Sequence, residues 1–123
     1  MSEVVKVAVD AMGGDNAPGE IVKGAVEAVR DVTNLKVILV GPEDRINNEL
    51  ADYTYDNDKI EVVNATEVIG FNEPPAYAVK KKKDSSIVVA MKLVRSGGAD
   101  AFVSAGSTGA ILVGGLGYIG RIK

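Results

Sequence analysis

Short runs of aliphatic residues alternate with segments of helical periodicity along the whole of this 123-residue chain. The first run, Val4–Val9, is rich in β-branched residues, which is typical of a strand buried on both faces of a parallel sheet. Similar runs predict strands at 37–40, 60–63 and 99–103, and helical spacing predicts helices at 18–29, 43–50, 85–97 and 110–119. Four successive strand-helix units predict an α/β fold with a mostly parallel sheet and helices on its faces.

The segment between residues 64 and 86 follows this pattern least. Pro74 and Pro75 lie within it, and we expect them to break any helix there. Four consecutive lysines, Lys80–Lys83, come next. Such a run is most often a solvated charged face, although its charge also suits an acidic protein or an anionic membrane.

The chain contains no histidine and no cysteine. The 123 residues therefore provide no disulfide, no thiol nucleophile, no Ser-His-Asp triad and none of the usual nitrogen and sulfur ligands of zinc. Lysines, carboxylates, hydroxyls and backbone N–H groups are left, and these hold charge better than they transfer protons near neutral pH. The net charge of −3 is unlike that of a duplex-binding protein, so we expect no nucleic acid partner.

No apolar stretch approaches the roughly 18 residues of a membrane span. The first residues, Met1–Lys6, include an acidic side chain and no long apolar core, so they do not resemble a secretory signal. We therefore expect a cytoplasmic protein.

Glycine is in excess, and eight of the 14 glycines lie between residues 97 and 123. Two of these, Gly106 and Gly109, flank Ser107 and Thr108 in the turn between the fourth predicted strand and the next predicted helix. Backbone N–H groups, hydroxyls and the positive end of that helix together suit phosphate or another oxyanion. A tight turn with a hydroxyl as helix N-cap is the alternative.

A second loop with glycines follows the first predicted strand. Its paired glycines, Gly13 and Gly14, would let a ligand approach the backbone, and Asp10 and Asp15 lie on either side of them. Alternatively, both glycines adopt positive φ in a turn, and Asp15 or Asn16 caps the following helix. Two carboxylates five residues apart indicate Mg²⁺ only weakly, so we predict no metal site.

A third candidate cluster precedes the third predicted helix. Lys83 provides an ammonium group there, and Ser85 and Ser86 provide hydroxyls, which together suit a phosphate or a carbonyl oxygen. Asp84 or Ser85 is the expected N-cap of this helix, and Gly97 is its expected C-terminal glycine.

Two further motifs fail in their context. Gly115–Gly120 matches G-x-G-x-x-G, but only four apolar residues precede it and no acidic residue follows at the required spacing. Ala105–Gly109 is close to a nucleophile elbow, but it begins with alanine, and the chain has no histidine to activate Ser107. We therefore expect neither nicotinamide binding nor serine hydrolysis.

Three segments together resemble the bacterial phosphate acyltransferase family, PlsX, namely residues 7–18, 82–86 and 100–110. The likeness runs in order to the last residues of the chain, and members of the family are considerably longer. Ser107 stands where the family more often has asparagine. The resemblance implies that residues 1–123 form the N-terminal part of a phosphate acyltransferase α/β domain, as a truncated or partial chain.

The resemblance implies transfer of a fatty acyl group from acyl-acyl-carrier protein to inorganic phosphate, which gives acyl phosphate for phospholipid synthesis. It also implies a three-layer α/β/α fold similar to isocitrate and isopropylmalate dehydrogenases and to phosphate acetyltransferases. A homodimer without a cofactor is implied as well, with peripheral membrane contact as an option. Because phosphate is already an anionic nucleophile, such an enzyme must bind it, align it with the thioester and stabilise the oxyanion.

The catalytic candidates are therefore Lys83, Asp10 and Asp15. Lys83 would neutralise the phosphate or the developing oxyanion, and the two carboxylates would orient the first loop. The candidate phosphate and substrate contacts are Gly13, Gly14, Ser85, Ser86, Gly106, Ser107, Thr108 and Gly109. A non-catalytic nucleotide- or phosphometabolite-binding module and an inactive fragment of the enzyme are the alternative functions.

Overall fold

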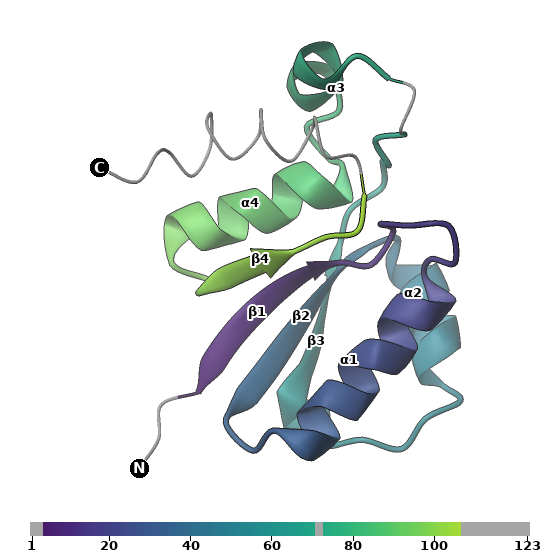
Figure 1. The fold of residues 1–123 in the computed structure, drawn as a ribbon, viewed down its shortest axis with the longest axis vertical. Coiled ribbons are helices and arrows are strands. Elements are labelled where there is room, and N and C mark those ends of the chain that lie inside the picture. The colour runs from purple at the N-terminus through teal and green to yellow at the C-terminus, as the bar shows by residue number, and fades with distance from the viewer. Residues whose placement is uncertain (1–3, 71–72, 107–123) are drawn as a thin grey trace.

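A computed structural model describes residues 4–70 and 73–106 of the chain. Its strands are β1 (Val5–Asp10), β2 (Leu35–Gly41), β3 (Ile60–Asn64) and β4 (Ala101–Val103). They form one parallel sheet with the order β3-β2-β1-β4 (Figure 1). Val7 of β1 lies opposite Val37 of β2 on one side and Ala101 of β4 on the other. The predicted parallel sheet is confirmed, and β1 lies between an early and a late strand.

Three of the four described helices cover this sheet in two layers. The helices are α1 (Gly19–Asp31), α2 (Glu43–Leu50), α3 (Pro75–Lys81) and α4 (Ser86–Ser96), with a short 3-10 turn at Asn57–Lys59. Helices α1 and α2 pack on one face over β2 and β3, and α4 packs on the other face over β4, β1 and β2 (Figure 1). Helix α3 packs against α4 away from the strands (Figure 1). This is the expected three-layer α/β/α arrangement. Within the described ranges, no helix has the length and apolar character needed to cross a membrane.

Strand β2 shows why the apolar runs predicted the sheet. Val37 and Leu39 pack with the side chains of α1 and α2, whereas Ile38 and Val40 pack on the opposite face with Ala90 of α4. These four consecutive side chains are all buried. A strand covered on both faces needs consecutive apolar residues rather than an alternating pattern, and this is the pattern that the sequence has.

Local signals set the ends of the helices. The N-cap of α4 is Ser85, whose Oγ accepts a hydrogen bond from the N–H of Val88 at 3.2 Å. The helix ends at Gly97, which has a φ of 85°, a left-handed conformation that favours glycine. Both expected ends of α4 are confirmed. Helix α1 begins one residue later than expected, at Gly19, with Pro18 as its N-cap.

The expectation that Pro74 and Pro75 break any helix was wrong, because α3 begins at Pro75. A proline at the first helical position loses no helical hydrogen bond, since the first N–H groups of a helix have no intrahelical acceptor. The carbonyl of Pro74 accepts a hydrogen bond from the N–H of Ala78 at 2.9 Å. Ala78 and Val79 are buried against α4, and this contact stabilises a helix of only seven residues.

Strand β4 begins at Ala101, two residues later than predicted. The N–H of Asp100 donates to the carbonyl of Lys6 at 2.7 Å, and its carboxylate accepts from the N–H of Lys6 at 2.9 Å. Ala99 instead donates to a carbonyl of α4 and so belongs to the turn that ends this helix. The helix predicted at 110–119, with the glycine motif that overlaps it, lies outside the described residues.

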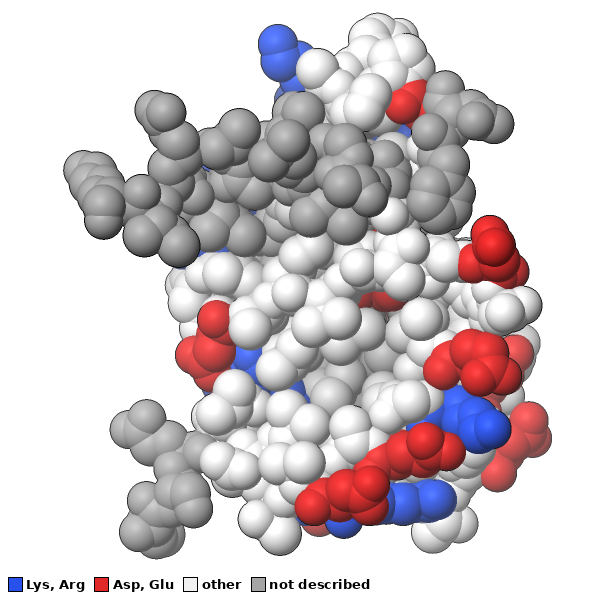
Figure 2. Space-filling model, viewed as in Figure 1, with Lys and Arg blue, Asp and Glu red and all other residues white. Residues whose placement is uncertain are grey.

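An apolar groove of about 340 Å³ runs beside α1 over β1 and β4. Val7, Val9 and Val103 line it from the sheet, and Ile21 lines it from α1. Val103 is 54% exposed. Figure 2 shows this face as a largely uncharged surface with charged side chains toward its rim. The layer formed by α1 and α2 therefore covers only part of the sheet.

Candidate functional site

The carboxylate of Asp10, the last residue of β1, is the point where three segments meet. Asp10 is only 2% exposed. Its Oδ1 accepts hydrogen bonds from the hydroxyl of Ser86 at 2.5 Å and from the N–H of Met12 at 3.0 Å. Its Oδ2 accepts one from the hydroxyl of Ser104 at 2.7 Å. These bonds join the carboxyl ends of β1 and β4 to the start of α4.

The partners of this carboxylate extend the network to the glycine-rich loop after β4. Burial of a carboxylate is costly unless hydrogen bonds replace those it made with water. The donors described for Asp10 are two hydroxyls and one N–H, all uncharged. A hydroxyl that donates its proton still has lone pairs that accept. The Oγ of Ser104 uses one of them to accept from the N–H of Gly106 at 2.9 Å.

Two glycines allow the loops after β1 and β4 to touch. A Cβ at Gly13 would lie 2.8 Å from the backbone nitrogen of Gly106 and 3.0 Å from Oδ2 of Asp10. A Cβ at Gly106 would lie 3.1 Å from Oγ of Ser104 and 3.2 Å from the same carboxylate oxygen. The contact therefore requires that Gly13 lack a side chain, and it leaves little room for one at Gly106. The two glycine loops that the sequence suggested separately are thus in contact at Gly13 and Gly106.

The first loop contains a second glycine with a different role. Gly14 has a φ of 94°, whereas Gly13 has no positive φ. The alternative interpretation of a turn with positive φ is thus right for Gly14 and wrong for Gly13. Asp15 is exposed, and α1 has no side-chain cap, so the alternative in which Asp15 or Asn16 caps this helix is also wrong.

The cluster before α4 places its hydroxyls inside the protein. Ser85 and Ser86 are 0% and 1% exposed. The hydroxyl of Ser85 caps the helix, and the hydroxyl of Ser86 donates to Asp10. Lys83 is exposed on the turn that precedes them. The two serines are therefore engaged within the protein, whereas the ammonium group of Lys83 is open to solvent.

Hydrogen bonds to Asp84 connect the start of α4 to the segment that follows β3. Oδ2 of Asp84 accepts from the hydroxyl of Thr66 at 2.5 Å and from the N–H of Thr66 at 2.9 Å. These hydrogen bonds hold the pKa of the Asp84 carboxyl below its usual range, and the bond from the Thr66 hydroxyl is the largest cause. The N–H of Ser86 donates to the carbonyl of Glu67 at 3.1 Å. The position of Ser86 beside Asp10 thus depends on this connection.

Comparison with known proteins identifies the family of this chain. The family model described as "Fatty acid synthesis protein" matches residues 5–123. The chain belongs to this family.

Several relatives of this chain are named phosphate acyltransferase. The one from Clostridium acetobutylicum is 50% identical over 117 residues, which cover 95% of this chain and 35% of that protein. The one from Dictyoglomus turgidum is 54% identical over 119 residues, which cover 97% of this chain and 35% of that protein. The chain spans about a third of the length of these relatives. The family resemblance predicted from three sequence segments is confirmed.

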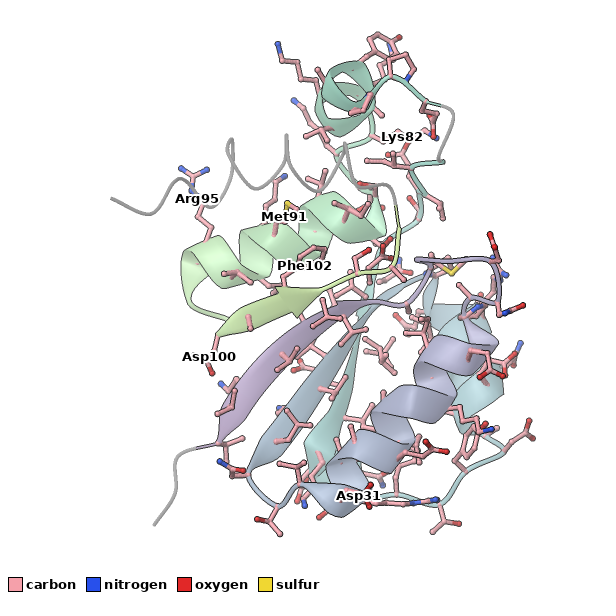
Figure 3. All side chains as sticks on the ribbon, viewed as in Figure 1. Asp31, Lys82, Met91, Arg95, Asp100 and Phe102 are labelled. Atoms are coloured by element: carbon pink, nitrogen blue, oxygen red, sulfur yellow. The ribbon has the colours of Figure 1, made fainter. Side chains whose placement is uncertain are left out.

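The sequence analysis did not predict Ser104 as a site residue. Ser104 directly follows β4 as Asp10 ends β1, so both lie at the carboxyl edge of the sheet, where open α/β sheets bind ligands. That shared position could have indicated Ser104 as a site residue. Ser104 contacts Asp10, however, only because β4 pairs with β1. Asp31 and Asp100 lie toward the opposite edge (Figure 3). The candidate residues Ser107, Thr108 and Gly109 lie outside the described part of the chain.

Proposed function

We propose that this chain forms part of an acyltransferase that moves a fatty acyl group from acyl-acyl-carrier protein to inorganic phosphate, for phospholipid synthesis. The name of its relatives, phosphate acyltransferase, supports the class of reaction. The observation that carries the proposal is the convergence of both glycine loops on the buried carboxylate of Asp10. This convergence lies at the carboxyl edge of the sheet, the usual ligand site of such folds.

The chemistry suits a chain without histidine or cysteine. A phosphate oxygen attacks the carbonyl carbon of the thioester, and the carbonyl oxygen becomes an oxyanion. The carbon–sulfur bond then breaks, which gives acyl phosphate and the carrier thiolate, and the thiolate takes up a proton. Phosphate needs no general base because it is already anionic, so the site must chiefly align the reactants and stabilise the oxyanion.

In this proposal the phosphate binds the loop that begins at Gly106. The backbone N–H groups of residues 107–110 and the hydroxyls of Ser107 and Thr108 would hold it, because the N–H of Gly106 already donates to Oγ of Ser104. Lys83 is exposed and lies three residues before Ser86 in the sequence. It would neutralise the phosphate or the oxyanion. Gly14 would leave room for the thioester at the first loop, whereas the missing side chain of Gly13 makes room for the loop after β4.

Asp10 acts in this proposal as a positioning residue rather than as a catalytic base. Its two oxygens are occupied by three donors, and one of these, Ser104, in turn holds the N–H of Gly106. Ser85 and Ser86 hold the start of α4 in the same arrangement. Asp15, which is exposed, would orient the surroundings of the first loop. A cytoplasmic homodimer with peripheral membrane contact belongs to the same proposal through the family resemblance.

Phosphate-dependent release of carrier thiol from the full-length protein tests this function. We expect free thiol to appear from acyl-acyl-carrier protein only when inorganic phosphate is added, and hydroxylamine to trap an equal amount of acyl phosphate as hydroxamate. Thiol release that is the same with and without phosphate would contradict the proposal. Binding of nucleotides or phosphorylated metabolites without any thiol release would instead support the non-catalytic module.

A further inference from the structure

Helix α3 presents a cationic outer surface. The segment from Pro74 to Lys83 contains four lysines and no acidic residue, in a chain of net charge −3. Lys80, Lys81 and Lys83 are exposed, and Tyr77 is 62% exposed. The ammonium of Lys81 lies 6.0 Å from the centre of the Tyr77 ring. We call these four exposed side chains the α3 surface, and lysines project from this end of the molecule in Figure 2.

Lys82, the third lysine of the run, points toward the preceding loop and fixes α3 to it. The Nζ of Lys82 lies 2.7 Å from Oε1 of Glu73 and donates to the carbonyl of Val68 at 2.8 Å (Figure 3). Glu73 also accepts from the N–H of Gly70 at 2.5 Å. These contacts, with the hydrogen bond from Lys82 as the largest cause, hold the pKa of Glu73 below its usual range. The backbone that carries the α3 surface is thus held at its C-terminal end, which reduces the backbone entropy lost when a partner binds.

The apolar side of α3 is already used within the protein. Ala78 and Val79 are buried in a cluster with Ile87 and Met91 of α4. A helix that inserts into a lipid surface needs a free apolar face, and polybasic lipid-binding segments usually hold about 4–8 Lys or Arg. The α3 surface offers three lysines and one tyrosine. An exposed aromatic ring is typical of protein interfaces, and the lysines around it suit a partner of opposite charge.

We propose that the α3 surface docks an acidic protein and, resting on the proposed function, that this protein is the carrier of the acyl thioester. The net charge of this chain would repel an acidic partner, so a local cationic surface would steer its approach. The α3 surface also lies close to the candidate site along the chain. Ser86 follows Lys83 by three residues and donates its hydroxyl to Asp10.

Two double variants of the full-length protein test this docking with equal changes in charge. Lys80→Glu with Lys81→Glu alters the α3 surface, and Lys6→Glu with Lys23→Glu alters exposed lysines on β1 and α1. Lys83 is left unchanged because it is a catalytic candidate. The rate of acyl transfer is measured with the acyl group on the carrier protein and on pantetheine, a small thiol.

For the α3 variant, we expect KM for the carrier-linked thioester to rise about tenfold and transfer from acyl-pantetheine to stay within about twofold. The control variant should keep both rates, and about 0.5 M salt should remove most of the difference between the two variants. Equal losses in both double variants, or an unchanged carrier KM in the α3 variant, would overturn the docking proposal. Loss of binding to anionic vesicles with an unchanged carrier KM would assign the surface to lipid instead.

The docking proposal can fail separately from the proposed function. If the wild-type protein transfers no acyl group to phosphate, the function is wrong, and binding of fluorescently labelled acyl carrier protein is then measured directly by anisotropy. Binding that the α3 variant weakens about tenfold and the control variant retains would still support docking. Equal binding by all three proteins, or no binding by any of them, would overturn it.

Discussion

At the scale of single residues, Asp10 shows how a buried carboxylate can shape a site through its neighbours. An ionised carboxylate only accepts hydrogen bonds, so the hydroxyls of Ser86 and Ser104 must point their protons toward it. This fixes the remaining lone pairs of Ser104, one of which accepts from Gly106. The conformation of the glycine-rich loop at Ser104–Gly106 therefore depends on hydrogen bonds to a side chain of the neighbouring strand.

Replacing Asp10 by asparagine tests this dependence. Asp10→Asn keeps the size of the side chain but puts an NH₂ donor where an oxygen accepted, so one hydroxyl loses its acceptor. We expect the free energy of unfolding to fall by about 1–3 kcal/mol in urea titrations. Asp31→Asn, the same change at an exposed position, should stay within about 0.5 kcal/mol of the wild type. Equal losses in the two variants would show that the hydrogen bonds of Asp10 stabilise the fold no more than an exposed aspartate does.

Gly13→Ala tests the contact between the two loops. The added Cβ would meet backbone nitrogen at 2.8 Å, and backbone cannot move aside as a flexible side chain can. We expect a loss of about 1–3 kcal/mol in unfolding free energy. Gly24→Ala is the matched control, because nothing lies within 4 Å of its Cβ and it sits inside α1. That change should stabilise by up to about 1 kcal/mol. A stable Gly13→Ala protein would mean that the loops do not need their close approach.

At the scale of elements, the start of α4 and the whole of α3 show what local rules can and cannot predict. Ser85 and Gly97 were predictable because capping and left-handed glycine depend on a few neighbouring residues. Helix α3 was not, because the effect of Pro75 depends on whether it starts a helix or interrupts one. That depends on the burial of Ala78 and Val79 against α4, which is a tertiary contact.

The connection between Asp84 and Thr66 predicts a pH dependence of stability. The pKa of Asp84 is lower in the folded state than in the unfolded chain, so its contribution is complete above the unfolded pKa of about 3.9. The contribution is lost as the pH falls through the lower, folded-state pKa. The difference in unfolding free energy between the wild type and Asp84→Asn should therefore be largest near neutral pH and shrink below about pH 4.

A second variant assigns this effect to its hydrogen bonds. Thr66→Val removes the hydroxyl that makes the largest contribution to the lowered pKa of Asp84. In this background the pH-dependent difference caused by Asp84→Asn should be smaller. The same difference at every pH, with or without the threonine hydroxyl, would contradict the assignment.

At the scale of the whole molecule, the sequence predicted the layers but not which loops meet. Apolar runs indicated parallel strands, and turn residues indicated loops at the carboxyl edge. Nothing in those runs specifies that β4 pairs with β1, and this pairing places Ser104 beside Asp10 and Gly106 beside Gly13. The three candidate clusters could therefore be found from the sequence, whereas the hydrogen bonds that join them could not.

The most direct test of this account is the phosphate dependence of acyl transfer by the full-length protein with Asp10→Asn. Because misplacement of a reactant by about 1 Å can cost roughly 100-fold, we expect kcat/KM for phosphate to fall by about that factor. KM for the thioester should change little, and Asp31→Asn, toward the opposite edge of the sheet in Figure 3, should match the wild type. Circular dichroism at the assay temperature would establish that each variant is folded. A folded Asp10→Asn protein with wild-type phosphate kinetics would contradict the account.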